Sequence, residues 1–202
     1  MSTSGTIAVK DKSGYIMGIY LHSDSYLENT GEILLEHYNT FEKATELISM
    51  GSCSVLYENI GDQHEFDDWE FFHEHHQCKF YHRDRGDKFE ILKAKSEKSF
   101  YAKYSESNDY LFKDGKWYVK TFELNDDQYN YVLLPLQEAL DIWRKEEDER
   151  QKEHKELLQN DEEHTKELAQ KVFGDVGDTK LSFDVSKLSV WPKSIVKPEQ
   201  QA

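Results

Sequence analysis

Side chains capable of catalysis or metal binding are concentrated in one stretch of the sequence, HEFDDWEFFHEHHQCKFYHRDRGD, from His64 to Asp87. It holds five of the nine histidines, one of the two cysteines and many carboxylates. Imidazole and thiolate groups bind zinc or nickel, and imidazoles and carboxylates also transfer protons. Three kinds of site are therefore open: a metal centre, a catalytic loop, or an acidic surface that contacts another macromolecule.

The spacing of these groups argues against a metal centre. Zinc sites take their ligands from rigid elements at set spacings, with hydrogen bonds that orient the ligands. Here the metal-binding side chains crowd within ten residues: His73, His75, His76, Cys78 and His82. In a strand they would alternate between two faces, so that each face offers a pair at most. The run also lacks the i,i+4 histidines of a helical H-E-x-x-H site. We expect solvated loop histidines, no metal and no cofactor.

No motif in the sequence identifies a reaction. Cys53 or Cys78 could be a nucleophile beside a histidine, but nothing pairs either thiol with a particular imidazole. The sequence contains no G-x-G-x-x-G, Walker A or G-x-S-x-G motif. Chance pairs of carboxylates carry little information in a chain with 40 acidic residues. We name no catalytic residue. Whether the chain is an enzyme stays open, and binding is favoured over catalysis.

The sequence RDRGD, which contains Arg83 and Arg85, has two interpretations. The first is a tight turn held by salt bridges. The second is the capture of a carboxylate or phosphate, for which the forked guanidinium group is suited. In the second case the pocket would draw on residues that converge at one end of the sheet: Asp24, Tyr26, His64, His82, Arg83, Asp84, Arg85 and Asp87.

The formal net charge of -15 limits the partners of this chain. Such a charge repels nucleic acid and anionic lipid and favours basic partners. We therefore expect no direct nucleic-acid binding. No apolar run is long enough for a membrane span, and the N-terminus does not resemble a signal peptide. Two cysteines form no disulfide framework, so we expect free thiols in a reducing cytoplasm.

The hydrophobic pattern predicts an α+β fold: an antiparallel sheet with two N-terminal helices packed on it, followed by a long acidic helical extension. Alternating apolar residues in TIAVKDKSGYIMGIYLH predict a hairpin, and Asp114-Gly115 predicts a second one, followed by a strand over 129–133. The first helix covers 33–38, with Asn29 or Thr30 as caps. The second begins after Thr40 and stops at Gly51.

Two further segments complete the predicted core, which spans residues 5–134. The acidic stretch 57–78 is interpreted as a loop or sheet edge interrupted by aromatic residues. Its candidate partner-contacting side chains are Asp67, Asp68, Trp69, Phe71 and Phe72. Residues 80–93 are interpreted as strand, turn and strand.

From Pro135 onward the pattern is helical, which predicts an acidic helical extension over 135–173. Large apolar residues are absent from 144–156, so this part cannot bury a face and should be solvated, with i,i+4 Glu–Lys pairs. A second helix is possible after the QND sequence. Four consecutive acids add to the candidate contact surface: Glu146, Glu147, Asp148 and Glu149. Residues 174–202 form an apolar tail, and the extension or the tail would allow homo-oligomers.

Several of these sequences together resemble a family of small, mostly uncharacterised proteins of tailed bacteriophages. The resemblance rests on GTIAV, GIYLHSDSYLENTGEILLEHYNTFEKATELISMG, FYHRDRGD and YLFKDGKWYV, and on His64 with Phe66 and Asp67. It covers roughly 5–119. Relatives often have Trp-Asp-Gly-Tyr where this chain has Ser-Asp-Ser-Tyr at 23–26. The family has no established activity. The resemblance implies a phage origin and action in the cytoplasm of an infected bacterium.

Two hypotheses of function follow. In the first, a phage accessory protein binds a host bacterial protein and modulates or inhibits it, in host takeover or anti-defence, through an acidic, aromatic-rich surface. Mimicry of DNA charge by the helix around 146–163 is a special case, diluted by the basic residues among its acids. In the second, a small ligand-binding module or enzyme captures a nucleotide-like signal in the arginine-lined pocket described above.

Overall fold

The computed structural model of the chain describes residues 3–125 and 128–173. The chain divides into two units, 1–150 and 151–202. The first unit contains the sheet, the shorter helices and the beginning of the last helix. The predicted apolar tail, 174–202, lies outside the described residues.

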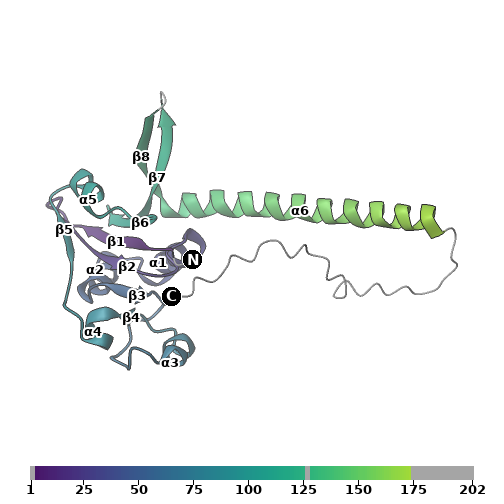
Figure 1. Cartoon of the computed structure of the whole chain (residues 1–202). Coiled ribbons are helices and arrows are strands. Elements are labelled where there is room, and N and C mark those ends of the chain that lie inside the picture. The colour runs from purple at the N-terminus through teal and green to yellow at the C-terminus, as the bar shows by residue number, and fades with distance from the viewer. Residues whose placement is uncertain (1–2, 126–127, 174–202) are drawn as a thin grey trace, which may run out of the picture. The chain divides into compact units, whose positions relative to one another are not determined.

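Eight strands form one sheet in the order β4-β3-β2-β1-β6-β7-β8, with β5 paired to β2 (Figure 1). The strands are β1 (Gly5–Lys10), β2 (Ile16–Leu21), β3 (Cys53–Val55), β4 (Lys79–Phe80), β5 (Leu92–Ala94), β6 (Asn108–Lys113), β7 (Lys116–Asn125) and β8 (Gln128–Pro135). The pairs β1–β6 and β2–β3 are parallel, and the others are antiparallel. The α+β class is confirmed, but the expected purely antiparallel sheet is wrong. Helices connect β2 to β3, and such crossovers return the chain in the same direction.

Local turn chemistry accounts for the two predicted hairpins. The Asp11 carboxylate accepts hydrogen bonds from the backbone N–H of Ser13 at 2.8 Å and of Tyr15 at 2.9 Å, which closes the β1–β2 turn. Asp114 and Gly115 have φ values of 51° and 79°, as a two-residue turn with left-handed backbone requires. Both hairpins are confirmed, and so is the strand predicted near 129–133, which is part of β8.

The segment between β2 and β3 contains a π-helical turn, η1 (Leu27–Gly31), and the helices α1 (Glu32–His37) and α2 (Phe41–Ser49). Thr40 caps α2 as predicted, because its side chain accepts the Lys43 N–H at 3.2 Å. The expected caps of α1 are wrong. The side chains of Asn29 and Thr30 donate instead to the carbonyl oxygen of Asp24, at 3.0 and 2.9 Å.

Residues 57–94 differ most from the sequence prediction. Part of the expected loop is the helix α3 (Trp69–Glu74), and the expected strand–turn–strand is β4 followed directly by α4 (Tyr81–Arg85). The buried Asp84 side chain accepts the Phe80 N–H at 2.7 Å, which turns the chain from strand into helix. Gly86 ends α4 with a φ of 79°. After α4 the chain rejoins the sheet only at β5 (Leu92–Ala94), later than the strand expected from Phe89.

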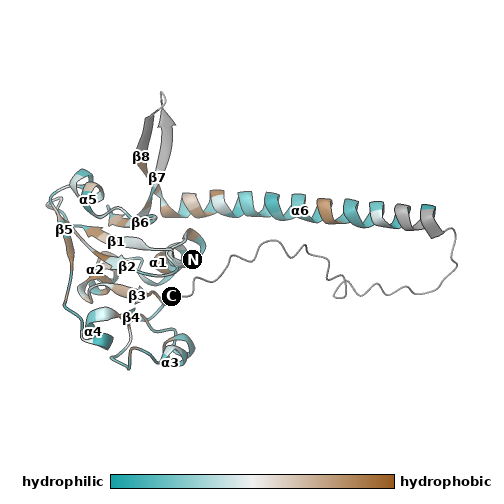
Figure 2. Ribbon diagram, viewed as in Figure 1, coloured by the Kyte–Doolittle hydropathy of each residue, from teal (hydrophilic) through white to brown (hydrophobic). Residues whose placement is uncertain are grey.

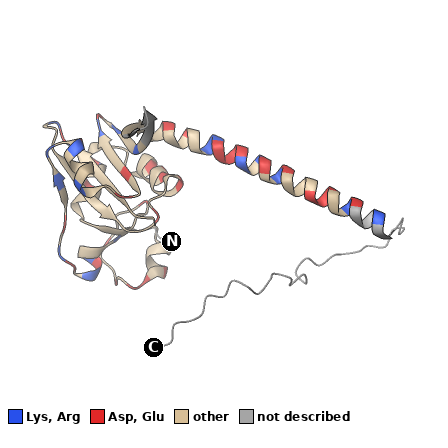
Figure 3. Ribbon diagram, turned by 45° about the horizontal axis from the view of Figure 1, so that its top comes forward, with Lys and Arg blue, Asp and Glu red and all other residues tan. Residues whose placement is uncertain are grey.

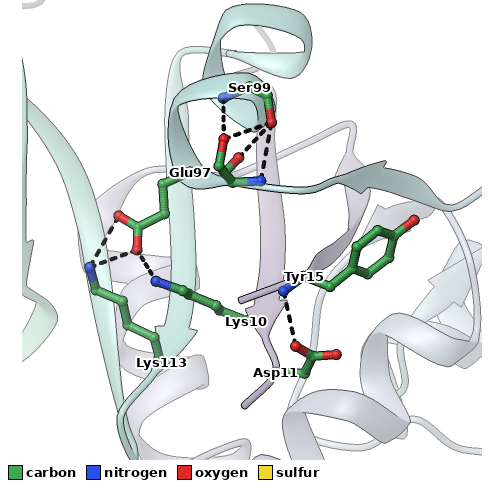
Figure 4. Close-up of polar contacts among 7 residues, drawn as sticks. Lys10, Asp11, Tyr15, Glu97, Ser99 and Lys113 are labelled. Atoms are coloured by element: carbon green, nitrogen blue, oxygen red, sulfur yellow. Dashed lines mark hydrogen bonds and ion pairs between the residues drawn. The ribbon is translucent and has the colours of Figure 1, made fainter. Parts of the chain in front are cut away.

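The helix α5 (Glu97–Tyr104) was not predicted. Ser96 and Ser99 form a capping box at its start. Glu97 bonds to Lys10 at 2.8 Å and to Lys113 at 3.1 Å, which ties α5 to β1 and β6 (Figure 4). The sequence signal was weak because only Phe100 and Tyr101 of this helix are buried.

Side chains from the two faces of the sheet belong to two hydrophobic clusters. The larger cluster joins Ile7, Val9, Ile19 and Leu21 to residues of α1 and α2, and the smaller joins Ala8, Ile16 and Leu111 to Phe100 and Tyr101 of α5. Alternate residues of β1 thus face opposite layers, as the period of a strand requires. Trp117, the largest fully buried side chain, donates its indole N–H to the Tyr38 carbonyl at 2.9 Å.

The last helix, α6 (Leu136–Phe173), is continuous, so the expected break after QND is wrong. Its first turns bury Leu136, Ala139 and Leu140 in the first unit. All side chains from 151 to 167 are exposed, and most of them are polar (Figure 2). The exceptions include Leu157 and Leu158, which are 63% and 53% exposed. Within the described residues, no helix combines the length and the apolarity that a membrane crossing needs.

Candidate functional site

Arg83 is used within the protein itself. Its Nη1 donates to the carbonyl oxygens of Ile60 and Gly61, both at 2.8 Å, and its Nη2 to the carbonyl of Cys78 at 2.6 Å. Nε and Nη2 also reach the two carboxylate oxygens of Asp84, at 2.6 and 2.9 Å. A guanidinium group has five N–H donors, and these contacts use all of them. Arg83 therefore fastens the loop at 60–61 to α4, and has no donor left for a phosphate.

Asp84 completes this fastening. Its side chain is fully buried and accepts the backbone N–H of Phe80 at 2.7 Å and of His64 at 3.3 Å, in addition to Arg83. Buried carboxylates are tolerated only with such partners. Asp84 is thus a structural centre that joins three segments of chain, which corresponds to the first interpretation of RDRGD.

The neighbouring charges of this turn are exposed. Arg85 forms an ion pair with Asp87, and the hydrogen bond from Arg85 lowers the pKa of Asp87. The Arg85 guanidinium also lies over the rings of Phe66 and Tyr81, 4.8 and 4.4 Å from their centroids. His82 Nδ1 is 2.7 Å from the carbonyl oxygen of Asp87.

A cavity of about 430 Å³ lies beside this turn, and its lining includes Met50, His82, Arg83 and Phe89. It is the closest counterpart of the predicted arginine-lined pocket. Its arginine, however, has no free donor. Asp24 and Tyr26 lie at the start of η1. The carbonyl oxygen of Asp24 accepts hydrogen bonds from the side chains of Asn29 and Thr30, and Tyr26 is 38% exposed. Of the eight predicted ligand-binding residues, His82 and Arg83 line this cavity.

The acidic aromatic stretch forms a surface at the start of α3. We define the α3 surface as the exposed residues Glu65, Asp67, Asp68, Trp69 and Glu70. Asp68 caps the helix by accepting the Phe71 N–H at 3.0 Å, and its hydrogen bond with His64 lowers its pKa. The His64 ring stacks on that of Phe71, with centroids 3.5 Å apart. Phe71 is half-buried and Phe72 fully buried, so Trp69 is the aromatic side chain that this surface presents.

The other histidines of this region also bond locally. His73 lies 3.4 Å from the Tyr57 hydroxyl, His75 Nδ1 lies 2.9 Å from the carbonyl of Phe71, and His76 pairs with Glu58 at 3.0 Å. These residues belong to α3 and the turn after it, where a loop or sheet edge was expected. Among the described residues, no group of three or more His, Cys, Asp or Glu side chains is arranged to hold a metal ion.

Lys79 is a feature that the sequence analysis missed. Its side chain has no exposed area, and its Nζ has no hydrogen-bond partner. The ammonium lies 3.3 Å from the centroid of the Trp69 ring, 3.9 Å from that of Phe66 and 5.6 Å from that of Phe72. Burial lowers the pKa of Lys79, against the charges of Asp67 and Asp84 that raise it. The signal in the sequence was a single lysine between Cys78 and Phe80, both apolar core residues.

The two cysteines are free and buried next to each other. The Cys78 thiol contacts the Tyr38 hydroxyl at 3.4 Å and the Tyr57 N–H at 3.2 Å. The Cys53 thiol donates to the carbonyl oxygen of Val55 at 3.1 Å. Burial raises the pKa of Cys53. The pair fills the core between β3 and the start of β4.

The four consecutive acids predicted to form a contact surface on α6 are flanked by Arg144, Lys145 and Arg150, and charges of both signs follow one another along the helix (Figure 3). Glu147 pairs with Arg150 at 3.2 Å, and Glu149 with Lys145 at 4.0 Å. Glu146 lies at a cavity of about 270 Å³, which Lys120 also lines. Asp148 is exposed. This part of α6 therefore presents charges of both signs.

Comparison with known proteins gave no relative: no family model, no curated protein and no solved structure matches this chain.

Proposed function

We propose that this protein is a phage accessory protein that binds a basic protein of the bacterial host through the α3 surface, and thereby modulates or inhibits it. One observation carries the proposal: Trp69 is 52% exposed and is flanked by exposed carboxylates at 65, 67, 68 and 70. The resemblance to tailed-phage proteins supports a host partner. Host takeover and anti-defence are the roles in which such binding would serve a phage.

The chemistry of the surface suits a basic partner. Tryptophan is among the residues that contribute most to binding energy at interfaces, because it buries a large rigid area. Carboxylates around such an anchor steer a cationic partner into place and raise its association rate. The formal net charge of -15 adds a long-range field of the same sign. No Lys or Arg lies between residues 57 and 78 to weaken it.

Two other interpretations have less support. Capture of a nucleotide-like signal requires free donors in the arginine-lined cavity, and those of Arg83 are all used within the protein. DNA mimicry by α6 requires a row of like charges. Arg144, Lys145 and Arg150 instead pair with neighbouring acids on that helix.

Affinity capture from the bacterial host tests the proposal. The tagged protein would be incubated with host lysate in low and in moderate salt, beside the variants Trp69→Ala and Tyr26→Ala. Tyr26 is the matched control, because it is an exposed aromatic residue outside the α3 surface. We expect the wild type to capture one host protein in stoichiometric amount. Moderate salt should reduce the amount captured, Trp69→Ala should abolish the capture, and Tyr26→Ala should retain it.

Two results would contradict the proposal. Equal recovery of the partner by both variants would place the contact elsewhere. A protein that emerges alone, with a small molecule bound in native mass spectrometry, would favour the ligand-binding module.

A further inference from the structure

The environment of Lys79 is unusual for a lysine. Lysine is almost never fully buried without a partner, because its ammonium loses hydrogen bonds to water. Lys79 is fully buried, and no acceptor replaces that water at its Nζ. Its interactions are instead with ring faces, chiefly those of Trp69 and Phe66, which lie 3.3 and 3.9 Å from the nitrogen at their centroids.

Aromatic rings around an ammonium, without hydrogen-bond acceptors, form the kind of cage that recognises alkylated ammonium groups. A methylated ammonium has few or no N–H donors, so it loses no hydrogen bond on entering such a cage. Lys79 has three donors and leaves all of them unpaired. The cage of Phe66, Trp69 and Phe72 therefore suits an alkylated ammonium better than it suits its present occupant.

One wall of the cage faces solvent, and the charges around it favour cations. Trp69, one wall of the cage, is 52% exposed. Asp67 is close enough to Lys79 to raise its pKa against the larger effect of burial, and both Asp67 and Glu70 are exposed. A cation that approaches the α3 surface thus reaches the cage wall, and the displaced Lys79 side chain would meet carboxylates.

We propose that Phe66, Trp69 and Phe72 form a binding site for an alkylammonium group, which Lys79 occupies in the free protein and which a methylated lysine of the partner enters on binding. The inference rests on the proposed function, because it names the side chain by which a basic partner would engage Trp69. It assigns Lys79 the role of an internal competitor that keeps the cage closed until a stronger ligand arrives.

Choline and its neutral isostere 3,3-dimethyl-1-butanol are matched probes, since they have the same shape and differ in charge. The titration follows the indole N–H signal of Trp69 by NMR, assigned with Trp69→Phe. The variants are Lys79→Ala, which empties the cage, and Lys79→Met, which fills it with a neutral side chain. We expect choline to bind Lys79→Ala at least tenfold more tightly than it binds the wild type or Lys79→Met, and dimethylbutanol to show no such preference.

The inference is wrong if choline leaves the Trp69 signal of Lys79→Ala unchanged, or if dimethylbutanol binds that variant equally well. Should Lys79→Ala fail to fold, the wild type gives the test: choline must shift the Trp69 signal and dimethylbutanol must not. Host capture does not enter this experiment. If choline does not bind but Trp69-dependent capture is intact, only the proposed alkylammonium site is contradicted. If choline binds but no host protein is captured, only the proposed binding to a host protein is contradicted.

Discussion

Asp84→Ala is the substitution that separates a structural role of the RDRGD turn from a ligand-binding role. The change leaves the buried Phe80 N–H without its acceptor and the Arg83 guanidinium without its carboxylate. Breaking a buried ion pair by removing one partner costs about 3–5 kcal/mol. For a chain of this size, each kcal/mol lowers the melting temperature by about 2–4 °C, so we expect a decrease of about 6–20 °C.

The assay is thermal unfolding followed by circular dichroism at pH 7, and Asp87→Ala is the matched control. Asp87 is a carboxylate on the same turn, also paired with an arginine, but its ion pair with Arg85 is exposed. Exposed pairs contribute little to stability, so Asp87→Ala should change the melting temperature only slightly. Equal decreases in the two variants would refute the conclusion that Arg83 and Asp84 hold the loop, the strand and α4 together.

Two further predictions concern charges elsewhere in the fold. Glu97→Gln should destabilise the protein by about 0.5–1 kcal/mol at pH 7, because it removes the ion pairs with Lys10 and Lys113. Despite burial, hydrogen bonds from Lys10 and Lys113 hold the pKa of Glu97 below its ordinary value of 4.5. The stability difference between Glu97→Gln and the wild type should therefore have its full size above pH 4.5 and disappear as the pH falls through the lowered pKa. A difference in chemical-denaturation midpoints that persists in acid would contradict this. Lys79→Met should leave the protein equally or more stable at pH 7, since the methionine removes an unpaired buried charge. Burial lowers the pKa of Lys79 below 10.5. The wild type should therefore gain stability relative to Lys79→Met as the pH rises through this lowered pKa toward 10.5. A large loss of stability in Lys79→Met at pH 7 would show instead that the ammonium stabilises the fold.

The parts of the fold that the sequence predicted are those fixed by local chemistry. Asp114-Gly115 requires a left-handed turn wherever it occurs between strands, and Thr40 caps the helix that follows it directly. The parallel pairing of β1 with β6 was not predictable in this way, because it joins Gly5 to Asn108 across most of the first unit. No local pattern specifies such a partner.

The candidate site shows the same division. Asp67, Asp68 and Trp69 of the α3 surface were identified from composition, since a dense run of carboxylates without basic residues is visible in the sequence. Glu65 and Glu70 were not singled out. The use of Arg83 was not visible, because its acceptors at 60, 61 and 78 are carbonyl oxygens of the backbone. The cage around Lys79 was missed for a related reason: its rings come from α3 and the loop before it, in a stretch assigned to no helix.

The most direct test of binding through the α3 surface is the association rate of the captured partner as a function of ionic strength. The variant Asp67→Asn/Glu70→Gln removes two charges from this surface, and Glu42→Gln/Glu46→Gln removes two exposed charges from α2 as a control. Charges at the edge of an interface act mainly on the association rate and its salt dependence. We predict slower association and a weaker salt dependence for the first variant, and wild-type values for the control. Identical rates and salt dependence for both variants and the wild type would contradict the proposed function.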